Sequence, residues 1–307
     1  METLAALRSL FTAWLIVAVI GLAVVFPYHT EVHQTITFRP EALDQKFYDK
    51  TYATDERELK YVQIAREAAK AFHIEEAVQG FVKQYGLERA HVLDIGAGSG
   101  LLQDEVVDYT GLDISASARR YFHKPFVQAD ARAMPFPAGE FDAAWSIWVL
   151  EHVPNPEMAL AEMRRVIKPN GLLFLYPAWL CSTLSAEGYR VRPYRDFGIK
   201  GKIIKSTAPV RDSALFHAFY LLPSRAVRRS SYAVLRQPTA FHYWPLVPNY
   251  DHYWEPDSDA VNSMDFYEGY LWFKSRGDIC LNCGSEWDIF RDYAMPLVIR
   301  VKPTGSS

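Results

Sequence analysis

A glycine-rich segment, residues 91–100, constrains the fold of this chain more than any other stretch. Its sequence, HVLDIGAGSG, is a short apolar run followed by glycines at positions 96, 98 and 100. Glycine is favoured where the backbone adopts a positive φ or where a ligand must approach the main chain closely. The pattern therefore predicts a β-strand that ends in a tight turn, followed by the N-terminus of a helix.

The chain on either side alternates between helical and strand patterns. A helix is expected over residues 54–85, ending at Gly86. Further strands are expected at 109–112, 126–129, 141–146 and 172–176, with helices at 115–123 and 154–167. This alternation predicts βαβ units and a parallel sheet, which binds ligands at the carboxyl ends of its strands. The glycine turn, Asp113 and Asp130 all follow strands and should share one crevice.

The composition is that of a globular protein, because half of the 307 residues are hydrophobic and 22% are charged. A net charge of -3 gives no reason to expect a nucleic-acid partner. Three cysteines are too few for a disulfide framework and favour a reducing compartment. Cys280 and Cys283 have the spacing of zinc ligands, but no second pair completes a four-ligand site, so no metal is expected.

The N-terminal segment has the character of a membrane anchor. Residues 9–28 contain no charged side chain, and residues 10–26 are almost wholly apolar. Their length suits one transmembrane helix and exceeds the apolar core of a typical signal peptide. A cleaved signal peptide and a buried core helix are the alternatives. The flanking charges do not choose an orientation.

The residues at the predicted strand ends suit a nucleotide-like ligand. Asp113 lies one strand–helix–strand unit beyond the glycines, where an acidic side chain accepts hydrogen bonds from ribose hydroxyls. Asp130 suits either an exocyclic amine of the ligand or the capping of its own loop. A dehydrogenase would require the spacing Gly-x-Gly-x-x-Gly, whereas here the third glycine follows the second after one residue.

Taken together, these segments resemble the class I S-adenosylmethionine-dependent methyltransferases. Residues 92–100 and 111–115 look like the first two motifs of that family, residues 128–136 with 141–142 are similar to the third, and residues 150–153 and 164–172 resemble the fourth and fifth. The similarity is to the small-molecule branch with a methyltransferase type 11-like domain, which includes quinone and sterol methylating enzymes. It covers residues 92–176, under a third of the chain.

The resemblance implies a cofactor, S-adenosyl-L-methionine, and a role for each matching residue. It places the methionine moiety at Asp94 and the glycines, the ribose at Asp113, the adenine at Asp130 and the sulfonium end near Trp148, although Trp148 suits plain core packing equally well. The full implied set is Asp94, Gly96, Ala97, Gly98, Gly100, Asp113, Ile114, Asp130, Ala131 and Trp148. The sequence departs from the family in one respect, because only residues 101–110 separate the last glycine from the second strand.

A general base is needed only if the methyl acceptor is a hydroxyl or a protonated amine. His152 follows the fourth strand and is the candidate catalytic residue, with simple packing at the start of the next helix as the alternative. His217, His242 and His252 lie in the region expected to bind the acceptor, and the sequence does not rank them.

Beyond residue 177 the family pattern fades. Basic residues accumulate between 190 and 236 around an apolar patch at 214–222, which suits a membrane surface or an ordinary solvated face over a core helix. Residues 241–273 are rich in aromatic side chains, which suit a ring-bearing or sugar acceptor, or a wall of packed loops. Two apolar stretches, 269–274 and 296–302, are predicted to be the antiparallel strands that complete the seven-stranded sheet of the family.

The sequence thus predicts a Rossmann-like α/β fold with a seven-stranded, mostly parallel sheet, helices on both faces and one N-terminal transmembrane helix. The expected organisation is an anchor at 1–30, a connector at 31–54, a methyltransferase core at 55–180 and an acceptor-binding region at 181–307. The expected function is methylation of a small-molecule, sugar or lipid-linked acceptor on the cytosolic face of a membrane. Protein methylation and a non-catalytic tethered scaffold are the alternatives, and the oligomeric state is open.

Overall fold

A computed structural model describes most of this chain. The described residues are 2–25, 45–53, 56–181, 189, 192–211, 213–246, 259–292 and 295–303. Most of the predicted connector, much of the aromatic stretch after residue 246, and the side chains of His217 and His252 lie outside them.

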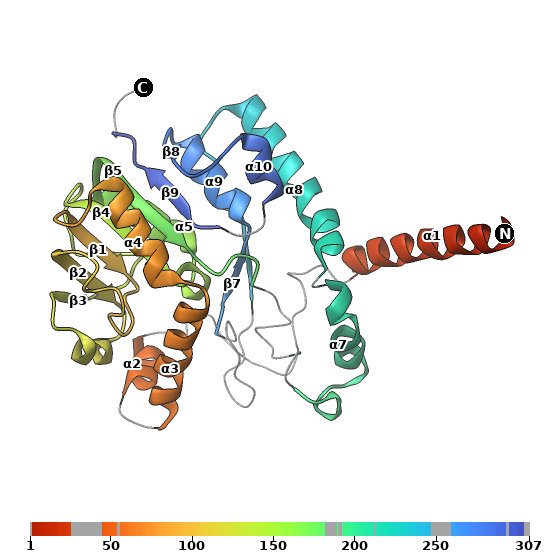
Figure 1. Ribbon diagram of the computed structural model, residues 1–307, viewed down its shortest axis with the longest axis horizontal. Coiled ribbons are helices and arrows are strands. Elements are labelled where there is room, and N and C mark those ends of the chain that lie inside the picture. The colour runs from red at the N-terminus through yellow and green to blue at the C-terminus, as the bar shows by residue number, and fades with distance from the viewer. Residues whose placement is uncertain are drawn as a thin grey trace.

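A seven-stranded sheet forms the centre of the molecule (Figure 1). Its order is β3-β2-β1-β4-β5-β9-β8, in which the first five strands are parallel and β9 and β8 are antiparallel to their neighbours. The strands are β1 (His91–Ile95), β2 (Asp108–Asp113), β3 (Phe126–Gln128), β4 (Phe141–Ile147), β5 (Ile167–Tyr176), β8 (Ile279–Cys280) and β9 (Leu297–Arg300). The predicted sheet is confirmed.

The central strands are apolar on both faces because helices cover the sheet from both sides. On one face Val92, Tyr109 and Trp145 pack against α4 (Ile74–Tyr85). On the other face Leu93 and Leu173 pack against α5 (Pro156–Val166) and α9 (Phe266–Ser275). Near-continuous hydrophobic strands are the signature of such a doubly covered parallel sheet.

The other helices are α1 (Glu2–Val25), α2 (Gln45–Tyr52), α3 (Glu56–Ala71), α7 (Ile199–Arg211), α8 (Ala214–Leu235) and α10 (Glu286–Arg291).

Two predicted helices differ from the structure. The single helix expected over 54–85 is divided into α3 and α4 at His73, whose φ of 53° is left-handed, and Gly86 ends α4 as predicted, with a φ of 66°. The helix expected after the glycine turn is wrong, because residues 101–107 form turns and bends. The Gln103 side chain holds these turns together by donating to the carbonyls of Gly100 and Tyr121. Residues 101–107 are too few to form a helix and also to lead the chain back to the start of β2.

The strand predicted at 269–274 is also wrong, because these residues lie in α9. The Asp265 side chain accepts a hydrogen bond from the Tyr267 amide and begins this helix, and the side chains from Phe266 to Phe273 are all buried. A helix buried all round has no amphipathic periodicity and looks like a buried strand in sequence. The strand that pairs with β9 is instead β8, whereas the prediction of a strand at β9 is confirmed.

The cysteine prediction needs a correction as well. Cys280 and Cys283 form a disulfide next to β8, and both pack against the core beneath. Only Cys181 has a free thiol, and it is buried. Two cysteines three residues apart therefore form a local covalent link in a segment that has little secondary structure of its own. Within the described residues no group of acidic, histidine and cysteine side chains is arranged to hold a metal.

The N-terminal residues form α1, which projects from the body of the molecule and contacts α8 (Figure 1). Its described side chains are largely exposed, including Leu10, Phe11 and Trp14. Judged on the described residues, none of the helices is both long enough and apolar enough to cross a bilayer. The predicted transmembrane helix is therefore not confirmed.

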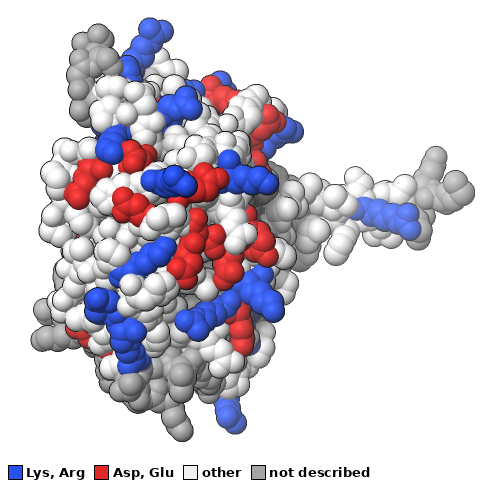
Figure 2. All heavy atoms as spheres, turned by 60° about the vertical axis from the view of Figure 1, so that its left-hand side comes forward, with Lys and Arg blue, Asp and Glu red and all other residues white. Residues whose placement is uncertain are grey.

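Several residues of the basic stretch have structural partners. Arg225 of α8 is buried, and its Nε donates to Oδ2 of Asp265 at 2.8 Å, while Arg228 donates to Glu268 at 2.7 Å. Both acids belong to the start of α9, so these pairs hold α8 against it. Figure 2 shows basic and acidic side chains intermixed on one face of the molecule.

Candidate cofactor and acceptor site

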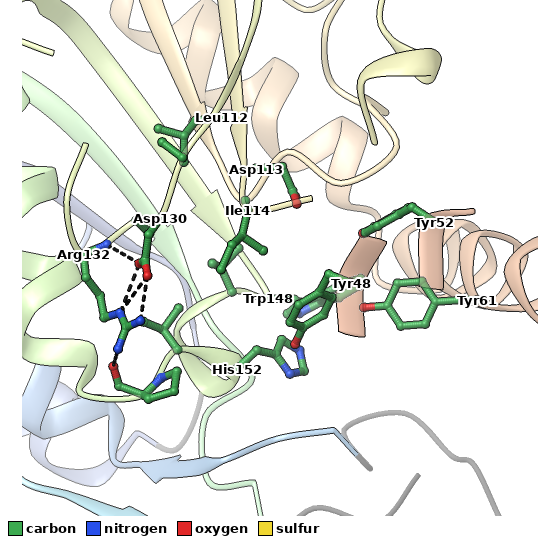
Figure 3. Close-up of a pocket in the computed structure, with 16 residues that line it drawn as sticks. Tyr48, Tyr52, Tyr61, Leu112, Asp113, Ile114, Asp130, Arg132, Trp148 and His152 are labelled. Carbon is green, nitrogen blue, oxygen red and sulfur yellow. Dashed lines mark hydrogen bonds and ion pairs between the residues drawn. The ribbon is translucent and has the colours of Figure 1, made fainter. Parts of the chain in front are cut away.

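A cavity of about 540 Å³ opens over the glycine turn at the carboxyl ends of the parallel strands. A smaller hollow of about 100 Å³ adjoins it and lies between Asp113 and Asp130 (Figure 3). The same side chains form the boundary of both, namely Tyr52, Tyr61, Trp148 and His152, together with the backbone of Gly96. Ten of the eleven residues predicted to bind the cofactor or to catalyse, all except Gly100, line one of these two spaces.

The glycine turn has the backbone conformation that the sequence predicted. Gly96, Gly98 and Gly100 have φ values of 75°, 51° and 66°, all in the left-handed region. A Cβ on Gly96 would lie 2.7 Å from Cγ1 of Val149, and one on Gly98 would lie 2.9 Å from the Tyr52 hydroxyl. Any side chain at these positions would fill the floor of the cavity, so the turn forms a cradle of main chain.

Asp113 is held at the end of β2 by main-chain amides. Its Oδ2 accepts from the Gly98 amide and its Oδ1 from the Ser115 amide, each at 2.9 Å. Burial raises the pKa of Asp113, and the amide hydrogen bonds offset part of that rise. Each carboxylate oxygen has a second lone pair, so the group can accept from a pair of vicinal hydroxyls as well. This geometry fits the ribose role implied for Asp113, with Ile114 beside it in the wall of the hollow.

Asp130 caps its own loop, which is the alternative that the sequence left open. Its Oδ1 accepts from the Arg132 amide at 2.8 Å, and the Arg132 guanidinium binds both carboxylate oxygens. Although burial raises the pKa of Asp130, the hydrogen bonds from Arg132 hold it below its ordinary value. Arg132 also donates to the Pro154 carbonyl, which closes this end of the hollow around Ala131. The adenine role of Asp130 and Ala131 remains a prediction.

Asp94 lies beneath the glycine turn, where it is nearly inaccessible to solvent. Its Oδ2 accepts from the Tyr109 hydroxyl at 2.8 Å. Burial raises the pKa of Asp94 from 3.8 to about 7, despite the hydrogen bond from Tyr109. A carboxyl group with this pKa is poised to ionise when a cation, such as the ammonium of a methionine moiety, binds beside it.

We expect the unliganded chain to lose stability as pH rises, and an Asp94→Asn variant to lose less. The native state retains the Asp94 proton up to about pH 7 whereas the unfolded state releases it near 3.8, so the native state binds more protons between these values. Between pH 5 and 8 this contributes a loss of about 3 kcal/mol. Urea unfolding at the two pH values gives the free energies of unfolding whose difference measures this loss. The exposed Asp108→Asn should show the wild-type slope, and a wild-type slope in Asp94→Asn would contradict the account.

One wall of the site is formed by α2 and α3 and was not predicted from the sequence. Tyr48 and Tyr52 of α2 and Tyr61 of α3 line the smaller hollow, and the Tyr52 and Tyr61 rings meet edge to face at 5.6 Å between centroids. The Asp49 carboxylate ties α2 to the loop after β2 by accepting from the Ser115 hydroxyl at 2.9 Å. The only signal in the sequence was the pair of tyrosines four residues apart, which places both on one face of a short helix.

Trp148 and His152 line both the cavity and the smaller hollow, and Figure 3 shows them in the wall of the hollow. Trp148 has a left-handed φ of 54°, and its ring contacts that of Phe72, just after α3, at 5.7 Å between centroids. His152 ends a single turn of 3-10 helix, η3 (Leu150–His152), and its Nδ1 lies 3.4 Å from Oδ2 of Asp259. His242 is exposed and does not line either space.

Comparisons with known proteins point to one family. A family model described as a methyltransferase domain matches residues 93–175. The chain is 31% identical to the ubiquinone biosynthesis O-methyltransferase of Pectobacterium carotovorum over 211 residues, which is 60% of this chain and 79% of the relative. It is 35% identical to the sterol 24-C-methyltransferase ERG6B of Gibberella zeae over 109 residues, 30% of this chain and 28% of the relative.

Solved structures of similar proteins include S-adenosylmethionine-bound CalS10, an amino pentose methyltransferase from Micromonospora echinaspora. That match has 21% identity and a TM-score of 0.35, and covers 48% of this chain and 60% of the other. This chain spans less than a third of the length of the two sterol methyltransferases that it matches. It spans more than two thirds of the quinone-pathway relative from Pectobacterium carotovorum. On the strength of that relative, the ordered motifs and the confirmed sheet, the chain belongs to the class I S-adenosylmethionine-dependent methyltransferases, whose cofactor is S-adenosylmethionine.

Proposed function

We propose that this chain methylates a small, largely apolar acceptor. The observation that supports this proposal is the larger cavity, which begins at the glycine turn and continues past Trp148 and His152 to an apolar wall. That wall is formed by side chains of α3, of the turn between α3 and α4, of the start of α4 and of the segment at the end of β5, including Ala65, Ala69, Phe72, Ile74, Tyr176 and Trp179. A cavity of this kind suits a ring system better than a charged peptide.

When bound, S-adenosylmethionine supplies an electrophilic methyl group on a sulfonium. The chain's own residues must hold the two reactants in line and exclude water, because direct displacement depends chiefly on alignment. Asp94, Asp113 and the glycine turn fix the cofactor side, and Trp148 with Phe72 forms the acceptor side. Tyr52 and Tyr61 line this cavity, and the Tyr52 hydroxyl lies close to Gly98.

The names of the relatives agree with an apolar acceptor. Proteins that resemble this chain include sterol, ubiquinone-pathway and demethylmenaquinone methyltransferases. Each of those names refers to a small molecule with fused or substituted rings. Their acceptors are not transferred to this chain individually, but they support the same chemical class.

Methyl-labelled S-adenosylmethionine tests this proposal directly. The purified chain would be incubated with the labelled cofactor and a cell extract, which would then be divided into organic-soluble, aqueous and precipitated-protein fractions. We expect the label in the organic-soluble fraction, and an Asp113→Ala variant should transfer none. Label confined to protein would instead support protein methylation. If the chain binds the cofactor but no fraction of the extract becomes labelled, the result would support a non-catalytic scaffold.

We also propose that the chain works at a membrane, with its catalytic domain on the cytosolic side, where the cofactor is made. The support is the apolar N-terminal sequence and the exposed Leu10, Phe11 and Trp14 of α1. Exposed apolar side chains in such a cluster mark interaction surfaces. The neighbouring α7 adds exposed Ile199 beside Lys200 and contains no acidic residue, so it suits an anionic surface.

Flotation with vesicles checks this membrane proposal. We expect the full chain to float with vesicles of phosphatidylglycerol and phosphatidylcholine, and a chain lacking residues 1–25 to remain largely in the dense fraction. A matched control carries Lys83→Glu on α4, away from this face, and should float as the wild type does. Equal flotation of the full and shortened chains would contradict a membrane role for α1.

A further inference from the structure

His152 has a partner that brings a distant part of the chain into the site. Asp259 lies 107 residues further along the chain, just before β7 (Asn262–Met264), yet its carbonyl oxygen and its Oδ2 lie 3.3 and 3.4 Å from Nδ1 of His152. The side chain of Asp259 is 3% exposed and that of His152 is 15% exposed. The pair is therefore a buried histidine–aspartate dyad in the wall of the cavity.

The backbone around the dyad is fixed on both sides. The Val261 amide donates to the Glu151 carbonyl at 2.8 Å, and the Asn262 side chain donates to the Val153 carbonyl at 2.5 Å. These bonds join β7 to η3, so the C-terminal segment determines where the imidazole of His152 lies. Figure 1 shows β7 running between the sheet and α8 to reach this position.

The chemistry of the contacts assigns the tautomer of His152. Both groups of Asp259 that face Nδ1 are oxygens that only accept, a carbonyl and a carboxylate. Nδ1 must therefore carry a hydrogen, and Nε2 is the ring nitrogen that gains or releases a proton. Nε2 lies 3.8 Å from Oε1 of Glu151, beyond hydrogen-bond distance but close enough to stabilise an imidazolium.

Acidic side chains lie on both sides of the His152 ring. Glu151 lies beside Nε2 and Asp259 beside Nδ1, and Arg132, which lines the smaller hollow, is already paired with Asp130. Burial raises the pKa of Tyr52 and of Tyr61, and nearby carboxylates raise both further, Asp113 and then Asp259 at Tyr52 and Asp259 at Tyr61, so both hydroxyls keep their protons. The charged and titratable groups around the dyad include Glu151, Tyr48, Tyr52 and Tyr61, and Arg66 in the wall of the larger cavity.

We propose that His152, positioned by Asp259, accepts the proton of a hydroxyl acceptor, so that the chain is an O-methyltransferase for an apolar molecule bearing a ring hydroxyl. This inference rests on the proposed function. In the reaction the acceptor oxygen forms the new bond to the methyl carbon while the bond from that carbon to sulfur breaks. The electron pair of the broken bond stays on sulfur, and the hydroxyl proton moves to Nε2 of His152. Asp259 stabilises the resulting imidazolium, which later releases the proton to water.

A chromogenic phenol tests the proton transfer without turnover. We would bind 4-nitrocatechol to the chain loaded with S-adenosylhomocysteine at pH 6 and record the phenolate absorption band. The wild type should bind the phenol and show the ionised band, His152→Gln should lose the band, and Asp259→Asn should weaken it. The exposed pair of His123 and Asp104 provides the matched control, since His123→Gln should behave as the wild type does.

The pH dependence of the methylation of catechol, which lacks the nitro group and ionises as a simple phenol does, gives the second readout. His152→Gln should lower kcat about 10²–10⁴-fold near neutral pH. The loss should shrink steadily as pH approaches the ionisation of the phenol itself, near pH 10 for a simple phenol. A structural defect would give a loss that does not recover with pH.

The outcomes separate this inference from the proposed function. If S-adenosylhomocysteine binds but 4-nitrocatechol does not, or if the band is equal in wild type and His152→Gln, the O-methyltransferase assignment is overturned while the methyltransferase assignment stands. An unchanged band in Asp259→Asn would remove Asp259 from the mechanism. If calorimetry shows no S-adenosylhomocysteine binding to the wild type, the proposed function itself fails.

Discussion

Replacing Asp113 by alanine should weaken the binding of S-adenosylhomocysteine about 10²–10⁴-fold. The carboxylate is expected to accept two ribose hydrogen bonds, and hydrogen bonds to a charged group contribute about 1.5–3 kcal/mol each. The same carboxylate anchors the Gly98 and Ser115 amides, so its loss also loosens the glycine turn. Equilibrium dialysis with labelled S-adenosylhomocysteine measures the change.

Asp108→Ala is the matched control for this variant, because Asp108 begins the same strand that Asp113 ends and its side chain is 60% exposed. It should bind S-adenosylhomocysteine as tightly as the wild type does. Equal affinities of Asp113→Ala and Asp108→Ala would contradict the position of the ribose at the end of β2.

Replacing Arg225 by alanine should destabilise the chain by about 3–5 kcal/mol. This change leaves Asp265 buried without its cation, and an uncompensated buried charge carries a penalty of that size. It also removes the donor to the carbonyls of Phe290 and Asp292, which holds α10 to α8. Urea denaturation followed by circular dichroism gives the free energy of unfolding.

Arg229 lies one turn further along α8 and provides the comparison. Its side chain is 47% exposed and lies 3.3 Å from Glu286, so Arg229→Ala should cost less than about 1 kcal/mol. Similar losses in the two variants would show that Arg225 acts as a surface charge and not as a buried link between α8, α9 and α10.

The sheet and the glycine turn could be predicted because their signals are local. A buried parallel strand reads as a short apolar run, and a turn with three positive φ values requires glycines at fixed positions. The carboxylates at the ends of β1, β2 and β3 follow from the topology alone, since parallel strands end at one edge. For these reasons Asp113 and Asp130 could be placed in one crevice from the sequence, whereas Asp94 was implied by the resemblance to the family.

The rest of the site depends on contacts between segments far apart in the chain. Asp259 reaches His152 across 107 residues, and α2 reaches the loop after β2 through Asp49 and Ser115. No periodicity or motif encodes either contact. The error at α9 has a different origin, because a helix buried on all sides lacks the polar face that distinguishes it from a strand.

The basic stretch shows how composition can mislead about a surface. Arg225 and Arg228 contributed to a predicted membrane-facing patch, yet they pair with acids of α9 and its N-cap. Sequence alone does not show that Asp265 and Glu268, about 40 residues away, neutralise them. The exposed basic residues of α7, such as Lys200 and Lys202, still belong to that patch.

Calorimetric titration of the wild-type chain with S-adenosylmethionine tests the central claim most directly. We expect saturable binding of one molecule per chain, which S-adenosylhomocysteine competes with and which is lost in Asp113→Ala but not in Asp108→Ala. An absence of binding by the folded wild type, or binding that Asp113→Ala leaves unchanged, would contradict the claim that the cavity over the glycine turn is a methyltransferase cofactor site.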